Sequence, residues 1–77
     1  MNNYIISEIL AKGTKQLISF GVQGARRDAR ILLSKILGSE QKQLIFNPNM
    51  VIEQSIENLF FSYIGRRCKR EPVSKII

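Results

Sequence analysis

The chain has 77 residues, a formal net charge of +6, one cysteine and no histidine. This length fits one small domain, and the composition excludes both an internal disulfide and a zinc site built from cysteine and histidine ligands. No run of about 18 consecutive apolar residues is present, so we predict no membrane-spanning segment. The excess of positive charge indicates an anionic partner or surface.

Apolar residues at three- and four-residue spacing predict a first helix from about residue 3 to residue 20. Its apolar stripe consists of Ile6, Ile9, Leu10, Gly13, Leu17 and Phe20. Gly13 lies on this stripe, where a glycine costs about 1 kcal/mol relative to alanine. The alternative is a break into two short helices at this point. We favour one helix, in which Gly13 lets a neighbouring helix come close.

A second helix is predicted over residues 25–37, and Gly38 is placed to end it in a left-handed conformation. Its apolar face consists of Ala25, Ala29, Leu32, Leu33, Ile36 and Leu37. Its polar face consists of Arg26, Arg27, Arg30 and Ser34. A short third helix is predicted over residues 40–46, with Ser39 as its N-cap.

A fourth helix is predicted to begin after Asn49, its expected N-cap, within a turn that contains Pro48. Its apolar stripe consists of Ile52, Ile56, Leu59, Phe60 and Tyr63. It ends in a basic run, which suits the negative C-terminal end of the helix dipole; this run is Arg66, Arg67, Lys69 and Arg70. Pro72 can begin a last helical turn, because proline fits the first position of a helix. The predicted fold class is therefore all-α, a small bundle of four to five helices.

No set of residues in the sequence indicates catalysis. Cys68 lies among cations, which favours its thiolate, but no histidine is available as a base. The six acidic residues are scattered along the chain, and we expect them on helix surfaces as solvated or paired charges. We therefore predict no catalytic, cofactor-binding or metal-binding residue in this chain.

The basic C-terminal run raises an alternative, a small basic helical nucleic-acid-binding domain. The run lies at the C-terminal end of a helix, whereas recognition helices read bases with their N-terminal residues. We also expect no stacking surface, because the aromatic residues Phe20, Phe46, Phe60 and Tyr63 fall on apolar stripes. Ile31 and Phe61 lie just off these stripes and are candidates for exposed apolar contacts with a protein. A third interpretation is a helical protein-binding module of another system, such as a toxin–antitoxin pair or a phage regulator.

Two stretches of the chain resemble the N-terminal domain of the PrmC/HemK family, whose members modify glutamine in peptide-chain release factors. The first is FGVQGARRDARILLSKILG, where the matching features are Gly21, Arg26-Arg27-Asp28-Ala29, Leu32-Leu33 and Leu37-Gly38. The second is the chain's ending, where they are Arg66-Arg67, Glu71-Pro72-Val73 and Ile76. The family commonly has an acid where this chain has Arg30, and a small residue, often glycine, where it has Arg70.

The resemblance implies that residues 1–71 are a helical substrate-recognition domain. Residues 72–77 would begin a linker toward a methyltransferase domain beyond Ile77, with Glu71-Pro72 turning the chain. The parent protein would transfer a methyl group from S-adenosylmethionine to the glutamine of the Gly-Gly-Gln loop in class I release factors. The cofactor and the catalytic residues would lie in that further domain. The expected partners are release factors and the protein's own catalytic domain, in the cytoplasm, without specific nucleic acid.

The resemblance also gives the basic run a structural role. We expect Arg66 or Arg67 to form an ion pair with Asp28 across the bundle. Such a pair stabilises a fold by about 0.2–1 kcal/mol when it is exposed, and by more when it is partly buried. Lys69 and Arg70 would remain free to contact an acidic surface of the partner. The predicted partner-binding residues are Ile31, Phe61, Lys69 and Arg70.

Overall fold

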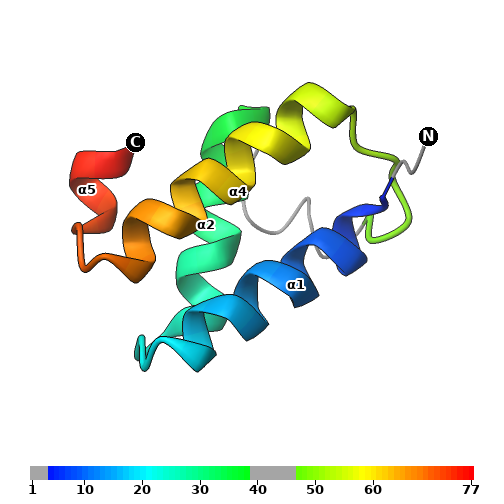
Figure 1. Ribbon diagram of the computed structural model, residues 1–77. Coiled ribbons are helices and arrows are strands. Elements are labelled where there is room, and N and C mark those ends of the chain that lie inside the picture. The colour runs from blue at the N-terminus through cyan, green and yellow to red at the C-terminus, as the bar shows by residue number, and fades with distance from the viewer. Residues whose placement is uncertain (1–3, 39–46) are drawn as a thin grey trace.

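The computed structural model describes residues 4–38 and 47–77, which form a bundle of helices. The helices are α1 (Ile6–Ser19), α2 (Ala25–Leu37), α4 (Gln54–Cys68) and α5 (Val73–Ile76). The three longer helices pack on one another, and the short α5 lies beyond the C-terminal end of α4 (Figure 1). The all-α prediction is confirmed, since these residues contain no strand beyond one isolated bridge between Ile5 and Val51. The predicted third helix over residues 40–46 lies outside the described residues.

α1 is one continuous helix, as predicted. The Ile5 N–H donates to Glu8 Oε1 at 3.4 Å, so an acid in the first turn provides an acceptor for a backbone N–H at the start of the helix. Gly13 is buried, and a Cβ built there would lie 2.7 Å from Cζ of Phe60 in α4. The close approach of two helices at this glycine is therefore confirmed.

α2 has the predicted bounds, and Gly38 follows it with φ 67°, in the predicted left-handed conformation. Two polar side chains on α2 are more buried than expected. Ser34 is 6% exposed, although it was placed on the polar face, and its hydroxyl donates to the Ile31 carbonyl at 2.9 Å. Asp28 is 5% exposed and forms the expected ion pair with an arginine of α4, so it is a paired charge but a buried one rather than a surface one. The polar face of α2 is therefore narrower than its sequence indicates.

The start of α4 was predicted wrongly. Residues 47–50 form the predicted turn, closed by the Met50 N–H and the Asn47 carbonyl at 3.2 Å, but α4 begins only at Gln54. The residues between run extended beside the segment before α1: the Ile6 N–H donates to the Met50 carbonyl at 3.0 Å, and the Ile52 N–H donates to the Tyr4 carbonyl at 2.9 Å. This backbone pairing keeps the chain out of a helical conformation after Asn49.

The core gathers side chains from all four helices. Its fully buried large members are Phe60, Ile6, Ile9, Leu17, Leu32, Leu33, Ile52 and Ile64. Two predictions for α4 are wrong: Leu59 is 42% exposed, and Ile64, which was left out of the stripe, is fully buried. The buried row of α4 follows four-residue spacing, because Phe60 and Ile64 both point at Gly13 of α1.

Two further expectations about burial are wrong. Phe20 is 50% exposed, because α1 ends at Ser19 and Gly21, with φ 76°, turns the chain so that Val22 enters the core instead. Glu57 is 8% exposed, and its Oε2 atom has no hydrogen-bond partner in the part of the chain that the structure describes. None of the helices described is long and apolar enough to cross a membrane.

Candidate functional site

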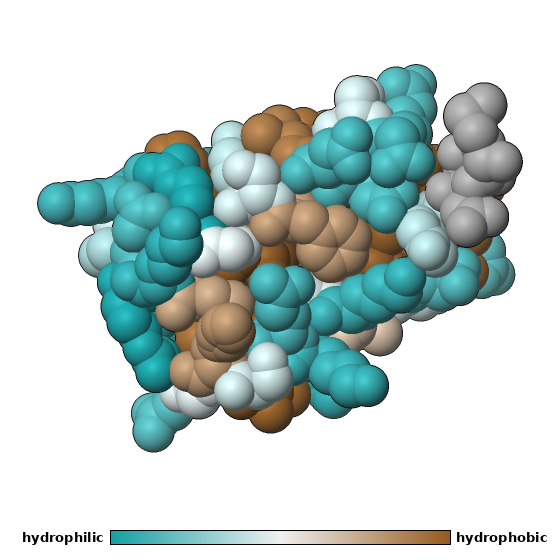
Figure 2. Space-filling model, in the orientation of Figure 1, coloured by the Kyte–Doolittle hydropathy of each residue, from teal (hydrophilic) through white to brown (hydrophobic). Residues whose placement is uncertain are grey.

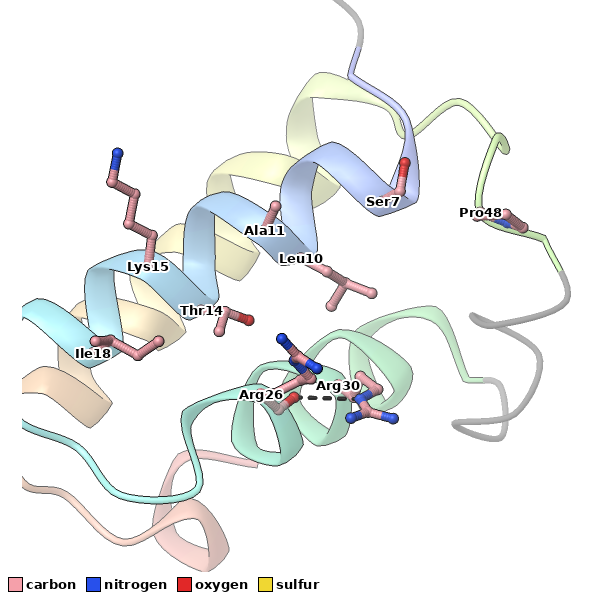
Figure 3. A pocket seen from close by; sticks show the side chains of 9 residues that line it. All are labelled: Ser7, Leu10, Ala11, Thr14, Lys15, Ile18, Arg26, Arg30 and Pro48. Atoms are coloured by element: carbon pink, nitrogen blue, oxygen red, sulfur yellow. Dashed lines mark hydrogen bonds between the residues drawn. The ribbon is translucent and has the colours of Figure 1, made fainter.

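An open groove of about 650 Å³ lies between α1 and α2 (Figure 3). It is lined by Ser7, Leu10, Ala11, Thr14, Lys15, Ile18, Arg26, Arg30 and Pro48. Its six residues from α1 recur at three- and four-residue spacing, so one face of this helix forms a wall of about 16 Å at 1.5 Å per residue. A second hollow shares Thr14, Ile18, Arg26 and Arg30 with it, and extends the groove toward Gly24 and Arg27.

The groove combines an apolar wall with a basic one. On α1, Leu10 and Thr14 point toward α2, and Ile18 is 63% exposed (Figure 3). On α2, Arg30 Nε donates to the Arg26 carbonyl at 3.4 Å, and neither arginine forms an ion pair with a described residue. No acidic residue is among those that line either hollow. The arrangement therefore suits an apolar ligand surface that carries negative charge.

Most arginines of the basic run at the end of α4 form ion pairs or hydrogen bonds with other residues of the same domain. Hydrophilic side chains gather at this end of the domain, at the left of Figure 2. Arg67 Nε lies 3.0 Å from Asp28 Oδ2, with side-chain exposures of 22% and 7%, so Arg67 rather than Arg66 pairs with Asp28. Arg67 Nη1 also donates to the Glu71 carbonyl at 3.3 Å. This arginine therefore ties α4 both to α2 and to the turn before α5.

Arg66 holds Glu71 through two hydrogen bonds, from Nε to Oε2 at 2.8 Å and from Nη2 to Oε1 at 3.1 Å. The hydrogen bond from Arg66 lowers the pKa of Glu71 below its usual value. The stabilisation from this pair is therefore present above the unfolded-state pKa of Glu71 and is lost as the pH falls through the lowered value. Pro72 follows, and Ile76 of α5 is 5% exposed, so this end of the chain packs on the helices.

Arg70 is not free, contrary to expectation. Its Nη2 donates to the Phe20 carbonyl at 2.8 Å, and its Nη1 donates to the Gly21 carbonyl at 3.5 Å. Its backbone has φ 73°, a left-handed conformation that costs a non-glycine residue about 1–2 kcal/mol. This conformation gives a physical reason for the glycine that is frequent at this position in the family that the sequence resembles.

We expect Arg70→Gly to be more stable to unfolding than Arg70→Ala by about 1 kcal/mol. Both variants lose the two hydrogen bonds to the α1–α2 turn, but only alanine keeps the left-handed strain. This order reverses the usual advantage of alanine over glycine. Urea unfolding of the two variants followed by circular dichroism measures the difference, and a more stable alanine variant would show that the position carries no strain.

The other predicted contact residues lie on different elements. Ile31 on α2 and Phe61 on α4 are each half-buried, and the Phe61 ring packs edge-on against Phe60 with centroids 5.2 Å apart. Both are thus less exposed than expected. Lys69, just after α4, is exposed, and its side chain forms no hydrogen bond or ion pair with a described residue.

Cys68 does not have the activated thiolate that its neighbours suggested. Burial raises the pKa of the Cys68 thiol and outweighs the lowering by Arg70 and Arg67. Its Sγ lies 3.9 Å from the Gln16 carbonyl, to which the thiol donates. No cluster of three potential metal ligands occurs among residues 4–38 and 47–77.

We expect iodoacetamide at pH 8 to alkylate Cys68 more slowly in the folded chain than in the same chain unfolded in urea. The raised pKa leaves less thiolate at this pH, and the half-buried position restricts access. Mass spectrometry of timed samples gives both rates. Equal rates, after correction for the effect of urea on a free thiol, would contradict the raised pKa.

The sequence reasoning missed the groove. Ile18 follows Leu17 of the predicted stripe, so it projects about 100° away from the core around the helix. The available signal was an isoleucine off the apolar stripe of one predicted helix, together with three arginines on the polar face of the next. What the sequence did not show was that the two faces lie side by side.

The chain belongs to the PrmC N-terminal domain family, whose sequence profile matches residues 8–77. It is 32% identical over 73 residues to a protein of Rhodospirillum rubrum named release factor glutamine methyltransferase, covering 95% of this chain and 22% of that protein. It is 28% identical over 74 residues to a bifunctional methyltransferase of Rickettsia felis, covering 96% of this chain and 14% of that one. The chain thus spans less than a quarter of the length of either relative. No solved structure matches it.

Proposed function

We propose that this chain is the domain by which a protein-glutamine methyltransferase holds its substrate, a class I peptide-chain release factor. The observation that carries the proposal is membership of the PrmC N-terminal domain family, together with the name of the Rhodospirillum rubrum relative. The name of that relative specifies both the transferred group and the substrate protein. The chain aligns with only 22% of it, which leaves room for a separate catalytic domain in the whole protein.

In the whole protein, the reaction would move a methyl group from S-adenosylmethionine to the side-chain amide nitrogen of the glutamine in the Gly-Gly-Gln loop. The protein would act in the cytoplasm, on release factors that terminate translation. We assign this domain a part in binding and positioning, with the methyl transfer in a further domain, because the family profile that matches residues 8–77 is that of the N-terminal domain.

Positioning is a physical contribution to catalysis. Contacts far from the reacting atom fix the orientation of the substrate, which removes part of the entropic barrier to the reaction. The ion pairs around Arg66 and Arg67 join α2, α4 and the turn at Glu71-Pro72. In our proposal this turn leads toward the catalytic domain, so that a bound release factor keeps a defined position relative to the active site.

An NMR titration tests the proposal. The ¹⁵N-labelled chain is mixed with an unmodified class I release factor, and separately with a short nucleic-acid duplex, at near-physiological salt. We expect localised shifts with the release factor and none with the duplex. Shifts only with the duplex, fading steeply as salt rises, would instead identify a phosphate-binding domain. Lys69 is retained as a candidate contact on the basis of its exposure, and it is followed in the same spectra.

A further inference from the structure

We propose that the groove between α1 and α2 receives an amphipathic helix of the partner, with apolar residues against α1 and acidic residues opposite Arg26 and Arg30. This inference rests on the proposed function and assigns it a place on the molecule. It moves the docking surface away from the end of α4, where the positive charge is densest in the sequence. The reason is that most of that charge is already paired, whereas Arg26 and Arg30 in the groove form no ion pair with a described residue.

The arginines at the end of α4 and those in the groove differ in the contacts that they already make. Arg66 and Arg67 form ion pairs with Glu71 and Asp28, and Arg70 donates to two backbone carbonyls. A partner that bound these arginines would have to displace those contacts. In the groove, Arg26 and Arg30 form no ion pair within the described residues, and no lining residue is acidic. An acidic partner therefore gains charge complementarity there without breaking the fold.

The shape of the groove favours a helix over a small molecule or an extended strand. A pocket that binds a small molecule encloses most of its surface, whereas this groove is open and follows α1 for about 16 Å, or three helical turns. A strand needs backbone partners along its length, but the backbone of α1 and α2 is already hydrogen-bonded within the helices. A helix satisfies its own backbone, so it can bind through side chains alone.

Ile18 is the central apolar contact of this proposal. It is 63% exposed, the largest exposure among the big apolar side chains of the described residues, and it lines both hollows of the groove. Leu10 and Ala11 continue the apolar wall toward the start of α1. Apolar side chains at the centre of an interface with charges at its rim are the usual arrangement for specific protein contacts.

Isothermal titration calorimetry with an unmodified class I release factor tests the inference. We expect Ile18→Ser and Arg30→Glu each to weaken binding by about tenfold or more, as for residues at the centre of an interface. The matched controls are Leu59→Ser, an exposed apolar residue on α4, and Lys75→Glu, an exposed cation on α5. Each control should change binding by less than about threefold. Circular dichroism checks that every variant is folded, and Arg26→Glu, at an exposed position, replaces Arg30→Glu if that variant is not.

The outcomes separate the inference from the proposed function. If the unmodified chain binds the release factor and only the groove variants weaken it, the inference is supported. If it binds with Ile18→Ser and Arg30→Glu at full strength, the groove is the wrong surface while the proposed function stands. If it does not bind the release factor at all, both are overturned. Binding of a nucleic-acid duplex that Arg30→Glu abolishes would show that the groove takes phosphate rather than a helix.

Discussion

Arg67→Ala is expected to lower the free energy of unfolding by about 3 kcal/mol, because it leaves Asp28 as a buried charge without its partner. The Asp28 side chain is 7% exposed, and Arg67 Nε lies 3.0 Å from its Oδ2 atom. A domain of this size is stabilised by only about 3–5 kcal/mol in total. We therefore expect a large unfolded fraction of this variant at 25 °C, measured by urea unfolding followed by circular dichroism.

The double-mutant cycle with Asp28→Ala shows whether the pair itself is responsible. Asp28→Ala should be milder, because Arg67 is 22% exposed and keeps its hydrogen bond to the Glu71 carbonyl. The double variant should be more stable than the sum of the two single losses predicts, since neither charge is then left alone. Arg66→Ala is the matched control: it also removes an arginine of the basic run, but its ion pair is solvent-exposed and the loss should be smaller. Simple additivity would contradict the assignment.

Gly13→Ala is expected to destabilise the domain by about 1–2 kcal/mol, although alanine favours helices over glycine by about 1 kcal/mol. The added Cβ would lie 2.7 Å and 2.8 Å from two ring atoms of Phe60, and 3.3 Å from Cδ1 of Ile64. Both neighbours are fully buried, so neither can move aside without disturbing the rest of the core. The clash therefore outweighs the gain in helix propensity. Gly13→Val adds two more methyl groups and is expected to prevent folding.

Gly65→Ala is the control for Gly13→Ala. Gly65 also lies inside a helix, but nothing is within 4 Å of a Cβ built there. Because the added methyl group meets no neighbour, only the higher helix propensity of alanine changes the stability. This variant is therefore expected to stabilise the domain by about 0.5–1 kcal/mol. Thermal unfolding of the two variants side by side separates the two effects. A stabilising Gly13→Ala would show that α1 and α4 are not as closely packed as the structure describes.

The features that the sequence predicted correctly depend on neighbouring residues along the chain. The bounds of α2 follow from its 3.6-residue periodicity and from Gly38, whose left-handed conformation ends the helix whatever packs against it. The continuity of α1 through Gly13 follows from an apolar stripe that keeps its spacing on both sides. The turn at residues 47–50 follows from the presence of proline and asparagine. All three features can be read from residues that are close together in the sequence.

The features that only the tertiary structure decided depend on residues far apart in the sequence. α4 begins at Gln54 rather than after Asn49, because residues 50–52 pair with the backbone before α1. Arg67 takes Asp28 as its partner across 39 positions, which leaves Arg66 to Glu71. The groove exists because α2 places Arg26 and Arg30 beside the face of α1 that carries Ile18. Periodicity along one helix gives the direction of a side chain, but only packing determines what that side chain meets.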